Sequence, residues 1–183
     1  MIIFTGVAGS GKSVQGRQLA DAKALPWVST GEFLRMLISG EKRKDMLSGK
    51  LLDDKEIISL IRKIFAVVDT NQEFVLDGFP RTLAQADWLL SQVKHGQLHV
   101  TAVVHLTASP EGVMKRLLSR GRPDDTKKAI EARFKEYEQE IVPILEHFKS
   151  AGVPVYDING EQGIDNVHQE IVQALNQTNG IKA

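Results

Sequence analysis

The stretch Gly6-Val7-Ala8-Gly9-Ser10-Gly11-Lys12-Ser13 decides how the rest of this chain is interpreted. An apolar run, Ile2-Ile3-Phe4, precedes it, and the helical pattern Val14 to Ala22 follows it. This order predicts a strand, a glycine-rich turn of the form GxxxxGK[ST], and a helix. The glycines of the turn let successive backbone N–H groups point into one concavity, where they can bind phosphate oxygens.

The end of this loop adds charge and metal-binding capacity to the concavity. The first turn of the following helix supplies unpaired N–H groups and the positive end of the helix dipole. Lys12 can reach the β- and γ-phosphates of a nucleotide, and the Ser13 hydroxyl can reach a magnesium ion. The motif therefore predicts a phosphate-binding loop, and it leaves open which compound carries the phosphates.

The composition is that of a globular protein with balanced charge. The 183 residues are 42% hydrophobic and 25% charged, and Lys+Arg and Asp+Glu both number 23. This length suits one compact domain, and the balanced charge favours neither nucleic acid nor a membrane as a partner. The absence of cysteine excludes disulfides and thiolate metal sites, and we expect no structural zinc. Met1 leads straight into an apolar run without a signal-like segment, so we expect a cytoplasmic protein.

Short apolar runs alternate with longer helical patterns along the whole chain. This alternation predicts the α/β class, with βαβ units that form a parallel sheet. Several of the runs are rich in Val and Ile, as expected when helices cover both faces of the sheet. The predicted strands are Ile2–Thr5, Trp27–Ser29, Phe74–Leu76, Thr101–Leu106 and Val153–Tyr156.

Two capping signals predict a small helical insertion between the second and third strands. Ser29-Thr30-Gly31-Glu32 has the form of a capping box, so a helix is expected to begin there. Asp53 precedes a second helical pattern with apolar positions from 57 to 68. Gly40, the basic run Lys42-Arg43-Lys44 and Gly49 are expected to break up a short, polar region, and the basic run itself is most simply interpreted as a solvated helix face.

Three further helices are predicted in the second half of the chain. Ser109-Pro110 begins one of them, and it is expected to end near Gly121. A long helix is expected from about Thr126, with a kink at Pro143. The last helix is expected over about Ile164 to Leu175.

The segment from Phe74 to Thr82 is a second candidate site. Asp77 ends a buried strand beside the phosphate loop, where an acidic residue can hold magnesium through water. Gly78 allows a ligand to approach the backbone, and Arg81 offers a planar fork for a phosphate. A helix cap or a turn residue is the alternative interpretation of Asp77.

Several arginines in the second half of the chain are expected to meet beyond the ends of the strands. Arg116 and Arg120 lie four residues apart on one helix face, Arg122 follows in the turn, and Arg133 lies near the buried stripe of the next helix. Such residues are ordinarily solvated and form weak surface pairs. A parallel sheet, however, places its ligands at these strand ends, and several arginines there would neutralise a large negative charge.

Taken together, these motifs resemble the adenylate kinases of the nucleoside monophosphate kinase family. The resemblance runs nearly end to end and in matching order. The segments that carry it are Gly6 to Ser13 with Gln15, Ser29-Thr30-Gly31-Glu32-Phe33-Leu34-Arg35, Gly49-Lys50-Leu51-Leu52, Asp77 to Thr82 with Gln85, Arg120-Gly121-Arg122-Pro123-Asp124-Asp125, Arg133 with Tyr137, and Ile158-Asn159-Gly160.

The resemblance implies a three-layer αβα P-loop domain spanning 1–183, with a five-stranded parallel sheet in the order 2-3-1-4-5. The core would comprise 1–29, 61–118 and 127–183, with a helical monophosphate-binding insertion at about 30–60 and a very short lid at about 119–126. The implied reaction is the reversible Mg²⁺-dependent transfer of the γ-phosphoryl group of ATP to AMP, giving two ADP. Such a transfer relies on positioning and cations, so no catalytic base is expected.

The resemblance also implies a role for each matching residue. The catalytic cations would be Lys12, Arg81, Arg120, Arg122 and Arg133. The ATP site would comprise Gly9, Ser10, Gly11, Lys12, Ser13, Val14, Arg116, Arg120 and Gln162. The AMP site would comprise Thr30, Gly31, Arg35, Lys50, Leu51, Leu52, Gly78, Phe79, Pro80, Arg81, Gln85, Arg122 and Arg133. Asp124 and Asp125 would orient the lid arginines, and Ser13 and Asp77 would hold Mg²⁺.

The chain departs from the family pattern in the phosphate loop and in the lid. Ser13-Val14 stands where the family has Gly-Thr, which removes a hydroxyl from the α-phosphate site, and the lid is short. Relatives that phosphorylate UMP or CMP have Ala where Thr30 stands, so Thr30 and Gln85 together favour AMP. The alternatives are a UMP/CMP kinase and a nucleotide-binding regulatory module without useful turnover. A monomer is the family expectation, and the five histidines are expected at the surface or the core edge.

Overall fold

A computed structural model describes residues 1–48 and 52–180 of the chain. Five parallel strands form one sheet in the order β2-β3-β1-β4-β5. All five predicted strands are present, and the predicted order is confirmed. The strands are β1 (Ile2–Gly6), β2 (Trp27–Ser29), β3 (Val75–Asp77), β4 (Ala102–Thr107) and β5 (Val155–Asn159).

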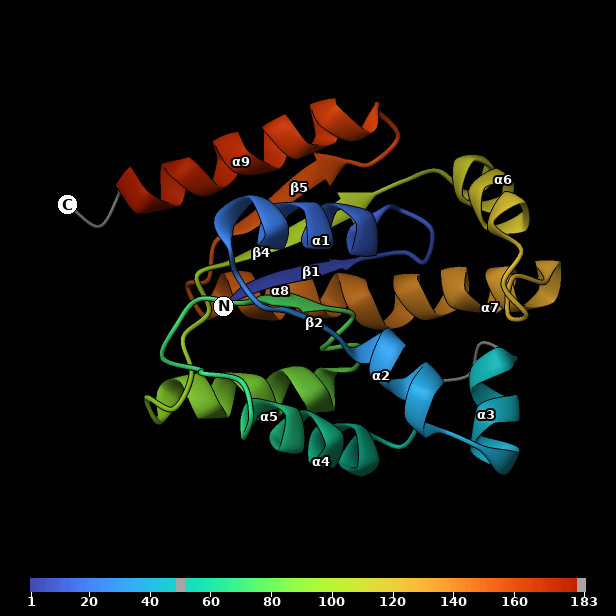
Figure 1. The fold of residues 1–183 in the computed structure, drawn as a ribbon, viewed down its shortest axis with the longest axis horizontal. Coiled ribbons are helices and arrows are strands. Elements are labelled where there is room, and N and C mark those ends of the chain that lie inside the picture. The colour runs from blue at the N-terminus through green and yellow to red at the C-terminus, as the bar shows by residue number, and fades with distance from the viewer. Residues whose placement is uncertain (49–51, 181–183) are drawn as a thin grey trace.

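Helices cover both faces of this sheet and gather at one end of it (Figure 1). In the described residues they are α1 (Lys12–Lys23), α2 (Thr30–Leu37), α3 (Gly40–Leu47), α4 (Asp54–Phe65), α5 (Leu83–Lys94), α6 (Pro110–Arg120), α7 (Lys127–Glu136), the π-helical turn η1 (Tyr137–Ile141), α8 (Val142–Ser150) and α9 (Ile164–Gly180). Across residues 1–48 and 52–180, every helix is too short or too polar to cross a membrane.

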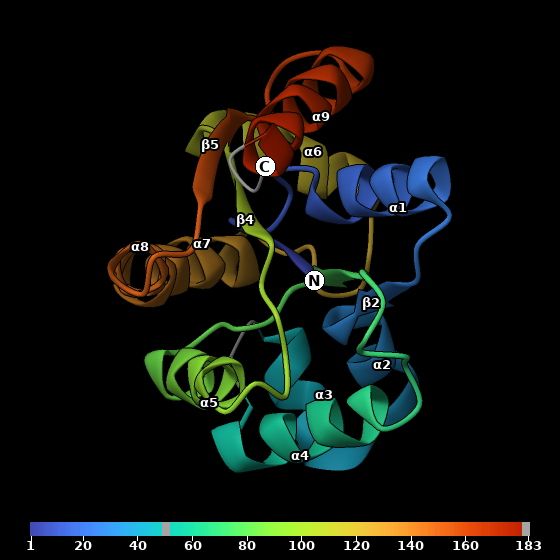
Figure 2. The same cartoon turned by 90° about the vertical axis from the view of Figure 1, so that its left-hand side faces the viewer.

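The alternation of side chains along each strand builds two separate hydrophobic layers. Ile2 and Phe4 of β1 pack with α1 and α9 on one face of the sheet. Ile3, between them, packs with α4, α5 and α8 on the other face. Figure 2, which views the sheet edge-on, shows α1 and α9 on one side and α5, α7 and α8 on the other. The three-layer αβα arrangement predicted from the sequence is confirmed.

The carboxyl ends of the strands lie where α2, α3, α6 and α7 surround the edge of the sheet (Figure 1). Helices α2, α3 and α4 separate β2 from β3. The turn between α6 and α7 is all that stands where the short lid is predicted, since α6 ends at Arg120 and α7 begins at Lys127. The division of the chain into core, insertion and lid stays a prediction.

The region between the two predicted insertion helices forms a helix of its own. Residues 40–47 form the continuous helix α3 and not a broken-up region, and the basic run 42–44 lies exposed on this helix, as the interpretation of a solvated helix face predicts. None of its residues is buried, so the segment carries no apolar stripe from which a helix could be predicted.

The two capping signals of this insertion have different outcomes. The Asp53 side chain accepts hydrogen bonds from the backbone of Lys55 and Glu56, as predicted. Ser29 precedes α2, but its side chain does not cap the helix. Its hydroxyl donates a hydrogen bond to Asp77 instead. The serine that resembles a helix cap in the sequence therefore contacts the carboxylate beside the phosphate loop.

The long helix predicted from Thr126 is interrupted before Pro143. Helix α7 ends at Glu136, and Tyr137–Ile141 form a π-helical turn that leads into α8. The backbone N–H of Val142 donates to Tyr137, five residues earlier. Proline lacks an N–H for the helical ladder, so an irregular turn next to Pro143 is physically consistent. Helix α9 also runs further than expected, to Gly180.

Candidate active site

The phosphate-binding loop joins β1 to α1 with a backbone that favours glycine. Gly6 has a φ of 132°, and a Cβ there would lie 2.2 Å from the carbonyl oxygen of Leu106. Gly11, which caps α1, has a φ of 105°. The strand, the glycine turn and the helix predicted from the sequence are therefore all present, with the amino end of α1 facing the loop.

Lys12 lies inside this loop, and its ammonium group donates hydrogen bonds to backbone carbonyl groups. Its Nζ donates to the carbonyl oxygens of Gly6 and Val7, at 2.6 and 2.7 Å. Burial lowers the pKa of Lys12 to about 8, while the nearby Asp77 carboxylate opposes the shift. A phosphate at the loop would offer this amine stronger acceptors than carbonyls.

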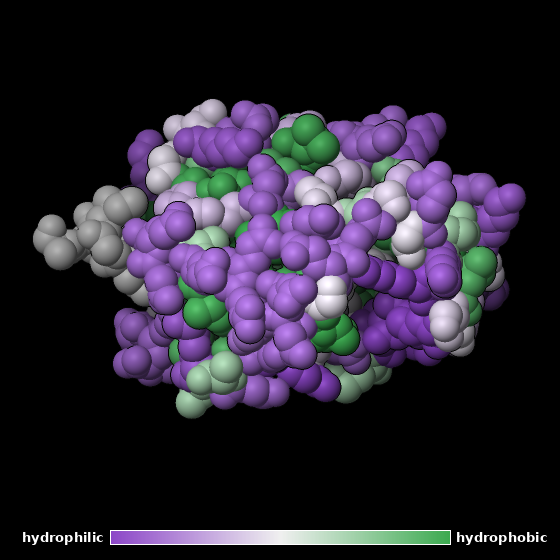
Figure 3. Space-filling view, turned by 90° about the horizontal axis from the view of Figure 1, so that it is seen from above, coloured by the Kyte–Doolittle hydropathy of each residue, from purple (hydrophilic) through white to green (hydrophobic). Residues whose placement is uncertain are grey.

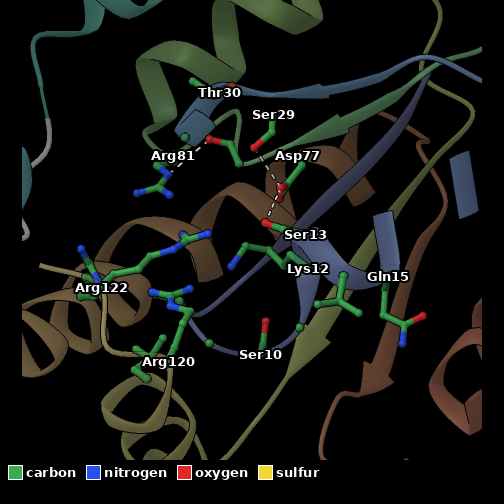
Figure 4. A pocket seen from close by; sticks show the side chains of 18 of the residues that line it. Ser10, Lys12, Ser13, Gln15, Ser29, Thr30, Asp77, Arg81, Arg120 and Arg122 are labelled. Carbon is green, nitrogen blue, oxygen red and sulfur yellow. Dashed lines mark hydrogen bonds between the residues drawn. The ribbon is translucent and has the colours of Figure 1, made fainter. Parts of the chain in front are cut away.

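Asp77 collects two hydroxyl groups at the end of β3. Ser13 Oγ donates to Asp77 Oδ2 at 2.6 Å, and Ser29 Oγ donates to the same oxygen at 3.2 Å. The sheet register pairs Phe4 and Ser29 with Asp77, which brings the carboxylate beside the phosphate loop. Figure 4 shows both hydroxyls directed at Asp77. The Asp77 side chain therefore accepts from two hydroxyl groups and does not cap a helix.

These groups border one cavity of about 460 Å³ at the carboxyl edge of the sheet. Figure 4 shows side chains of the phosphate loop, of the segment after β3 and of the α6–α7 turn around one open space. The predicted residues that line it are Gly9, Ser10, Gly11, Lys12, Ser13, Val14, Thr30, Gly31, Arg35, Leu52, Asp77, Gly78, Arg81, Gln85, Arg116, Arg120, Arg122, Asp124, Arg133 and Gln162.

Carboxylates orient the arginines of the α6–α7 turn. Arg120 makes a bidentate pair with Asp125, through Nε at 2.9 Å and Nη2 at 2.7 Å. Arg133 pairs with Asp124 and lies 3.6 Å from Asp125. Burial raises the pKa of Asp125, but the hydrogen bonds from Arg120 and the Arg122 backbone outweigh it and hold that pKa below its ordinary value. Asp124 and Asp125 thus pair with Arg133 and Arg120, and their role in orienting lid arginines stays a prediction.

Glu32 links α2 to the α6–α7 turn through two arginines. It accepts a hydrogen bond from Arg35 Nη2 at 2.6 Å and lies 3.4 Å from Arg122 Nη2. The bond from Arg35 is the main reason that the pKa of Glu32 lies below its ordinary value. The cavity is therefore bordered by arginines from α2 on one side and from the α6–α7 turn on the other.

Arg81 and Gln85 lie where the acceptor is predicted to bind. Arg81 Nε donates to the Gly78 carbonyl at 3.2 Å, and the Arg81 backbone N–H donates to Gln85 Oε1 at 2.9 Å. Gln85 Nε2 donates to Asp54 at 2.8 Å. Each end of this amide therefore has one intramolecular partner and one remaining hydrogen-bonding position. The Thr30 hydroxyl is buried without a partner at the same wall.

The opposite end of the cavity is formed by the turn after β5. Arg116 Nη1 donates to the Gly160 carbonyl at 2.8 Å. Gly160 itself packs against the phosphate loop, because a Cβ on it would lie 2.4 Å from the Ser10 carbonyl oxygen. Gln162 and Ile164 complete this wall.

Some predicted residues lie elsewhere. Phe79 and Pro80 do not line the cavity: both are buried, and the Phe79 ring packs edge-on against Trp88. Asp125 lies behind the cavity wall, where it orients Arg120. Lys50 and Leu51 lie outside the described residues.

One histidine expectation is wrong. His105, in β4, is buried within the sheet, with its ring nitrogens 2.5 Å from Asp157 and 2.8 Å from the Tyr137 hydroxyl. A hydrogen-bonded histidine in the middle of a strand gives no periodic signal that separates it from a surface one.

Sequence reasoning also missed the carboxylates Glu32 and Glu136. Glu136 lies 3.6 Å from Arg81, from the far end of α7. Its position three residues after Arg133 places both on one helix face, and that spacing was the available signal. The apolar part of the cavity wall was missed too, namely Leu34, Met46 and Ile57.

The site suits a nucleotide-bound divalent cation. A hydroxyl and a carboxylate, Ser13 and Asp77, meet beside the phosphate loop, and oxygen ligands are those that Mg²⁺ prefers. Within residues 1–48 and 52–180, no group of three or more His, Cys, Asp or Glu side chains could hold a metal by itself. The donor set therefore fits a cation that arrives with phosphates and keeps most of its waters.

A parallel sheet in this order, with a phosphate loop and a cavity lined by arginines, is typical of the class of P-loop nucleoside monophosphate kinases. A family model described as adenylate kinase matches residues 4–153. The adenylate kinase of Corynebacterium urealyticum is 31% identical over 182 residues, covering 96% of this chain and 99% of the relative. That of Leptospira biflexa is 32% identical (95% and 98% covered), and that of Prochlorococcus marinus strain MIT 9211 is 33% identical (95% and 96% covered). The chain belongs to the adenylate kinase family.

Proposed function

We propose that this chain catalyses the reversible, Mg²⁺-dependent transfer of the γ-phosphoryl group of ATP to AMP, giving two ADP. The observation that carries the proposal is the convergence of Lys12, Arg81, Arg120, Arg122 and Arg133 on one cavity from four separate segments of the chain. With Arg35 and Arg116, seven cationic side chains line a cavity of about 460 Å³, which suits a site that neutralises two phosphorylated substrates at once.

The chain's own groups would act by position and charge. Phosphoryl transfer has a loose transition state whose charge spreads over the oxygens of the moving group. Lys12 would leave the loop carbonyls and follow that group, while Arg120, Arg122 and Arg133 would close around it. Arg35 and Arg81 would hold the phosphate of the acceptor. Hydrogen bonds and ion pairs already orient these arginines, so little reorganisation is required when charge develops.

Ser13 and Asp77 would hold the magnesium ion, which would supply positive charge to neutralise the phosphates of the nucleotide. At the donor end, Arg116 and the backbone of Gln162 would border the base of ATP. The turn between α6 and α7 would act as the lid, because the transferring group must be shielded from water as a competing acceptor.

AMP is the acceptor that this wall favours. The buried Thr30 hydroxyl has no partner, and the Gln85 amide has one free position at each end. Both can hydrogen-bond a base at the wall that also carries Arg81. A UMP or CMP acceptor would place its phosphate against the same Arg35 and Arg81 and would differ only in how its base contacts Thr30 and Gln85.

The decisive experiment is an acceptor panel with the purified protein, ATP and Mg²⁺. AMP, CMP, UMP, GMP and dAMP are offered in turn, and diphosphate formation is followed. Rapid turnover with AMP alone among the ribonucleotides is expected. Preference for UMP or CMP would keep the reaction and overturn the base assignment, and tight ATP binding without turnover on any acceptor would favour a regulatory binding module.

The exposed Val14 is the observation that favours such a module, since it removes a hydroxyl from the donor loop. The complete set of cations argues for turnover. We also propose that the enzyme acts as a monomer in the cytoplasm, and sedimentation of the purified protein tests the first of these.

A further inference from the structure

Glu136 is a largely buried carboxylate that the proposed mechanism does not use. It is the last residue of α7, and its side chain is 15% exposed. Its Oε1 lies 3.6 Å from Arg81 Nη1, and Glu136 is not among the residues that line the cavity. A buried carboxylate is costly unless cations compensate it, so its location requires an explanation.

The contacts of Arg81 suggest what the carboxylate does. Arg81 Nε is fixed by the Gly78 carbonyl, and the guanidinium is 41% exposed toward the cavity. A planar group held by one hydrogen bond can still rotate about its long side chain. The Glu136 carboxylate attracts Nη1, the opposite edge of the same plane, and so restricts that rotation.

Four other arginines of the cavity follow the same scheme, whereas Arg116 donates to the Gly160 carbonyl. Arg120 has Asp125, Arg133 has Asp124, and Arg35 and Arg122 share Glu32. Each of these cations is thus directed by a carboxylate that lies beside or behind it. Glu136 is the carboxylate that stands in this relation to Arg81.

The backbone around Glu136 is held in place by the sheet. Tyr137, the next residue, begins the π-helical turn, and its hydroxyl lies 2.8 Å from Nε2 of the buried His105 in β4. The two rings also stack, with centroids 5.8 Å apart. This contact fixes the end of α7, and thereby the point from which the Glu136 side chain extends.

We propose that Glu136 is a positioning residue that holds Arg81 in the orientation that binds the acceptor phosphate. The inference rests on the proposed role of Arg81 at the AMP site. It links that site to α7, the helix that follows the lid and carries Arg133. Loss of the charge on residue 136 would then weaken acceptor binding while leaving donor binding unchanged.

The charged groups that face Glu136 give this proposal a pH signature. Arg81 after β3, Lys12 of α1 and Arg133 of α7 stabilise the charged carboxylate, and Glu140 of η1 opposes it. Burial outweighs the cations and raises the pKa of Glu136 above its ordinary value. As the pH falls through that raised pKa, Glu136 takes up a proton and Arg81 loses its partner.

The test compares Glu136→Gln with the wild type in steady-state kinetics from pH 5.5 to about 8.5. Above the pKa, the variant is expected to raise the KM for AMP about threefold to tenfold and to leave the KM for ATP within about twofold. The ratio of the variant's KM for AMP to that of the wild type should fall as the pH drops toward the raised pKa of Glu136, because the wild type then begins to lose the same charge. Titration of the AMP phosphate affects both proteins equally and cancels in this ratio.

Glu138→Gln is the matched control, because Glu138 is an exposed carboxylate on the same turn. It should leave both KM values unchanged, and Glu136→Asp, which keeps the charge, should restore part of the AMP affinity. An unchanged KM for AMP in Glu136→Gln, or an equal rise in the KM values for AMP and ATP, would overturn the positioning role. Melting temperatures of all variants check that the fold is intact.

Arg81→Ala separates this inference from the proposed function. If Arg81→Ala raises the KM for AMP and Glu136→Gln does not, only the role of Glu136 fails. If neither variant changes the KM, the acceptor site itself has been assigned wrongly. In the Arg81→Ala background, Glu136→Gln should have no further effect on AMP.

Discussion

The Ser13 hydroxyl donates a 2.6 Å hydrogen bond to Oδ2 of Asp77, which lies 64 residues later in the chain. Parallel pairing of β1 with β3 makes this contact possible, because Phe4 is in register with Asp77 and the phosphate loop follows directly. The hydroxyl occupies the position after the loop lysine, where it can face a nucleotide-bound cation. The phosphate loop and the end of β3 therefore form one unit at the proposed cation site.

Ser13→Ala is expected to raise the Mg²⁺ concentration for half-maximal activity about fivefold or more. The reason is that the variant removes one of two oxygen groups at the cation site and leaves Asp77 in place. Activity is measured against Mg²⁺ at fixed ATP, and calorimetry compares the binding of ATP with and without Mg²⁺. Ser13→Thr, which keeps the hydroxyl, is the control, and an unchanged Mg²⁺ requirement in Ser13→Ala would exclude the hydroxyl from the site.

Val14→Thr is expected to lower the KM for ATP about threefold to tenfold, since it adds a hydroxyl that can donate to a charged phosphate oxygen. Val14 is 53% exposed, so the change does not disturb the core. Val14→Ala is the matched control because it shortens the side chain without adding a donor. If Thr and Ala variants bind ATP equally, a hydroxyl at this position has no value in this loop.

The activity of the free enzyme is expected to fall on the basic side of a pKa of about 8, the lowered pKa of the buried Lys12. Above that pH the amine loses the charge that attracts phosphates, so kcat/KM for ATP should decline. Bound phosphates favour the ammonium form, and the basic limb of kcat should therefore lie at higher pH. The free energy of unfolding should instead rise with pH over this range. Between about pH 8 and 10.5, Lys12 is protonated in the unfolded chain and not in the folded chain, so raising the pH favours the folded state.

Lys12→Arg checks the assignment, because arginine stays charged over this range. Its residual activity should show no basic limb near pH 8. A limb that persists in this variant would have to arise from another group. Lys12→Ala should lower turnover by orders of magnitude while the protein stays folded.

The fold could be predicted from the sequence because its signals are local and repeated. The glycine turn before Lys12 and the short runs of Val and Ile define the strand and helix order, and strand order followed from the resemblance. The structure differs from the prediction where a residue with a local signal also has a partner far away in the sequence. Ser29 looks like a helix cap, yet Asp77, its cross-strand neighbour, takes the hydroxyl.

The missed parts of the site are those that depend on three-dimensional proximity. Glu136 and Glu32 reach arginines that are far away in sequence, and a carboxylate on a helix gives no sign of whether it faces water or a cation. Buried His105 was missed for the same reason, since Asp157 and Tyr137 come from another strand and another helix. Motifs therefore identify groups that contact a ligand more readily than groups that orient them.

Gly160→Ala is expected to weaken ATP binding and to lower stability by about 1–3 kcal/mol. A Cβ there would lie 2.4 Å from the Ser10 carbonyl oxygen and 3.0 Å from that of Thr107, so the phosphate loop or the turn after β5 has to move. Gly163→Ala is the control, because a Cβ at that position meets nothing within 4 Å. Denaturant unfolding and ATP titration of both variants check the prediction. Equal behaviour of the two would mean that the turn yields without disturbing the loop, and the close approach of Gly160 to Ser10 would then have no part in forming the donor site.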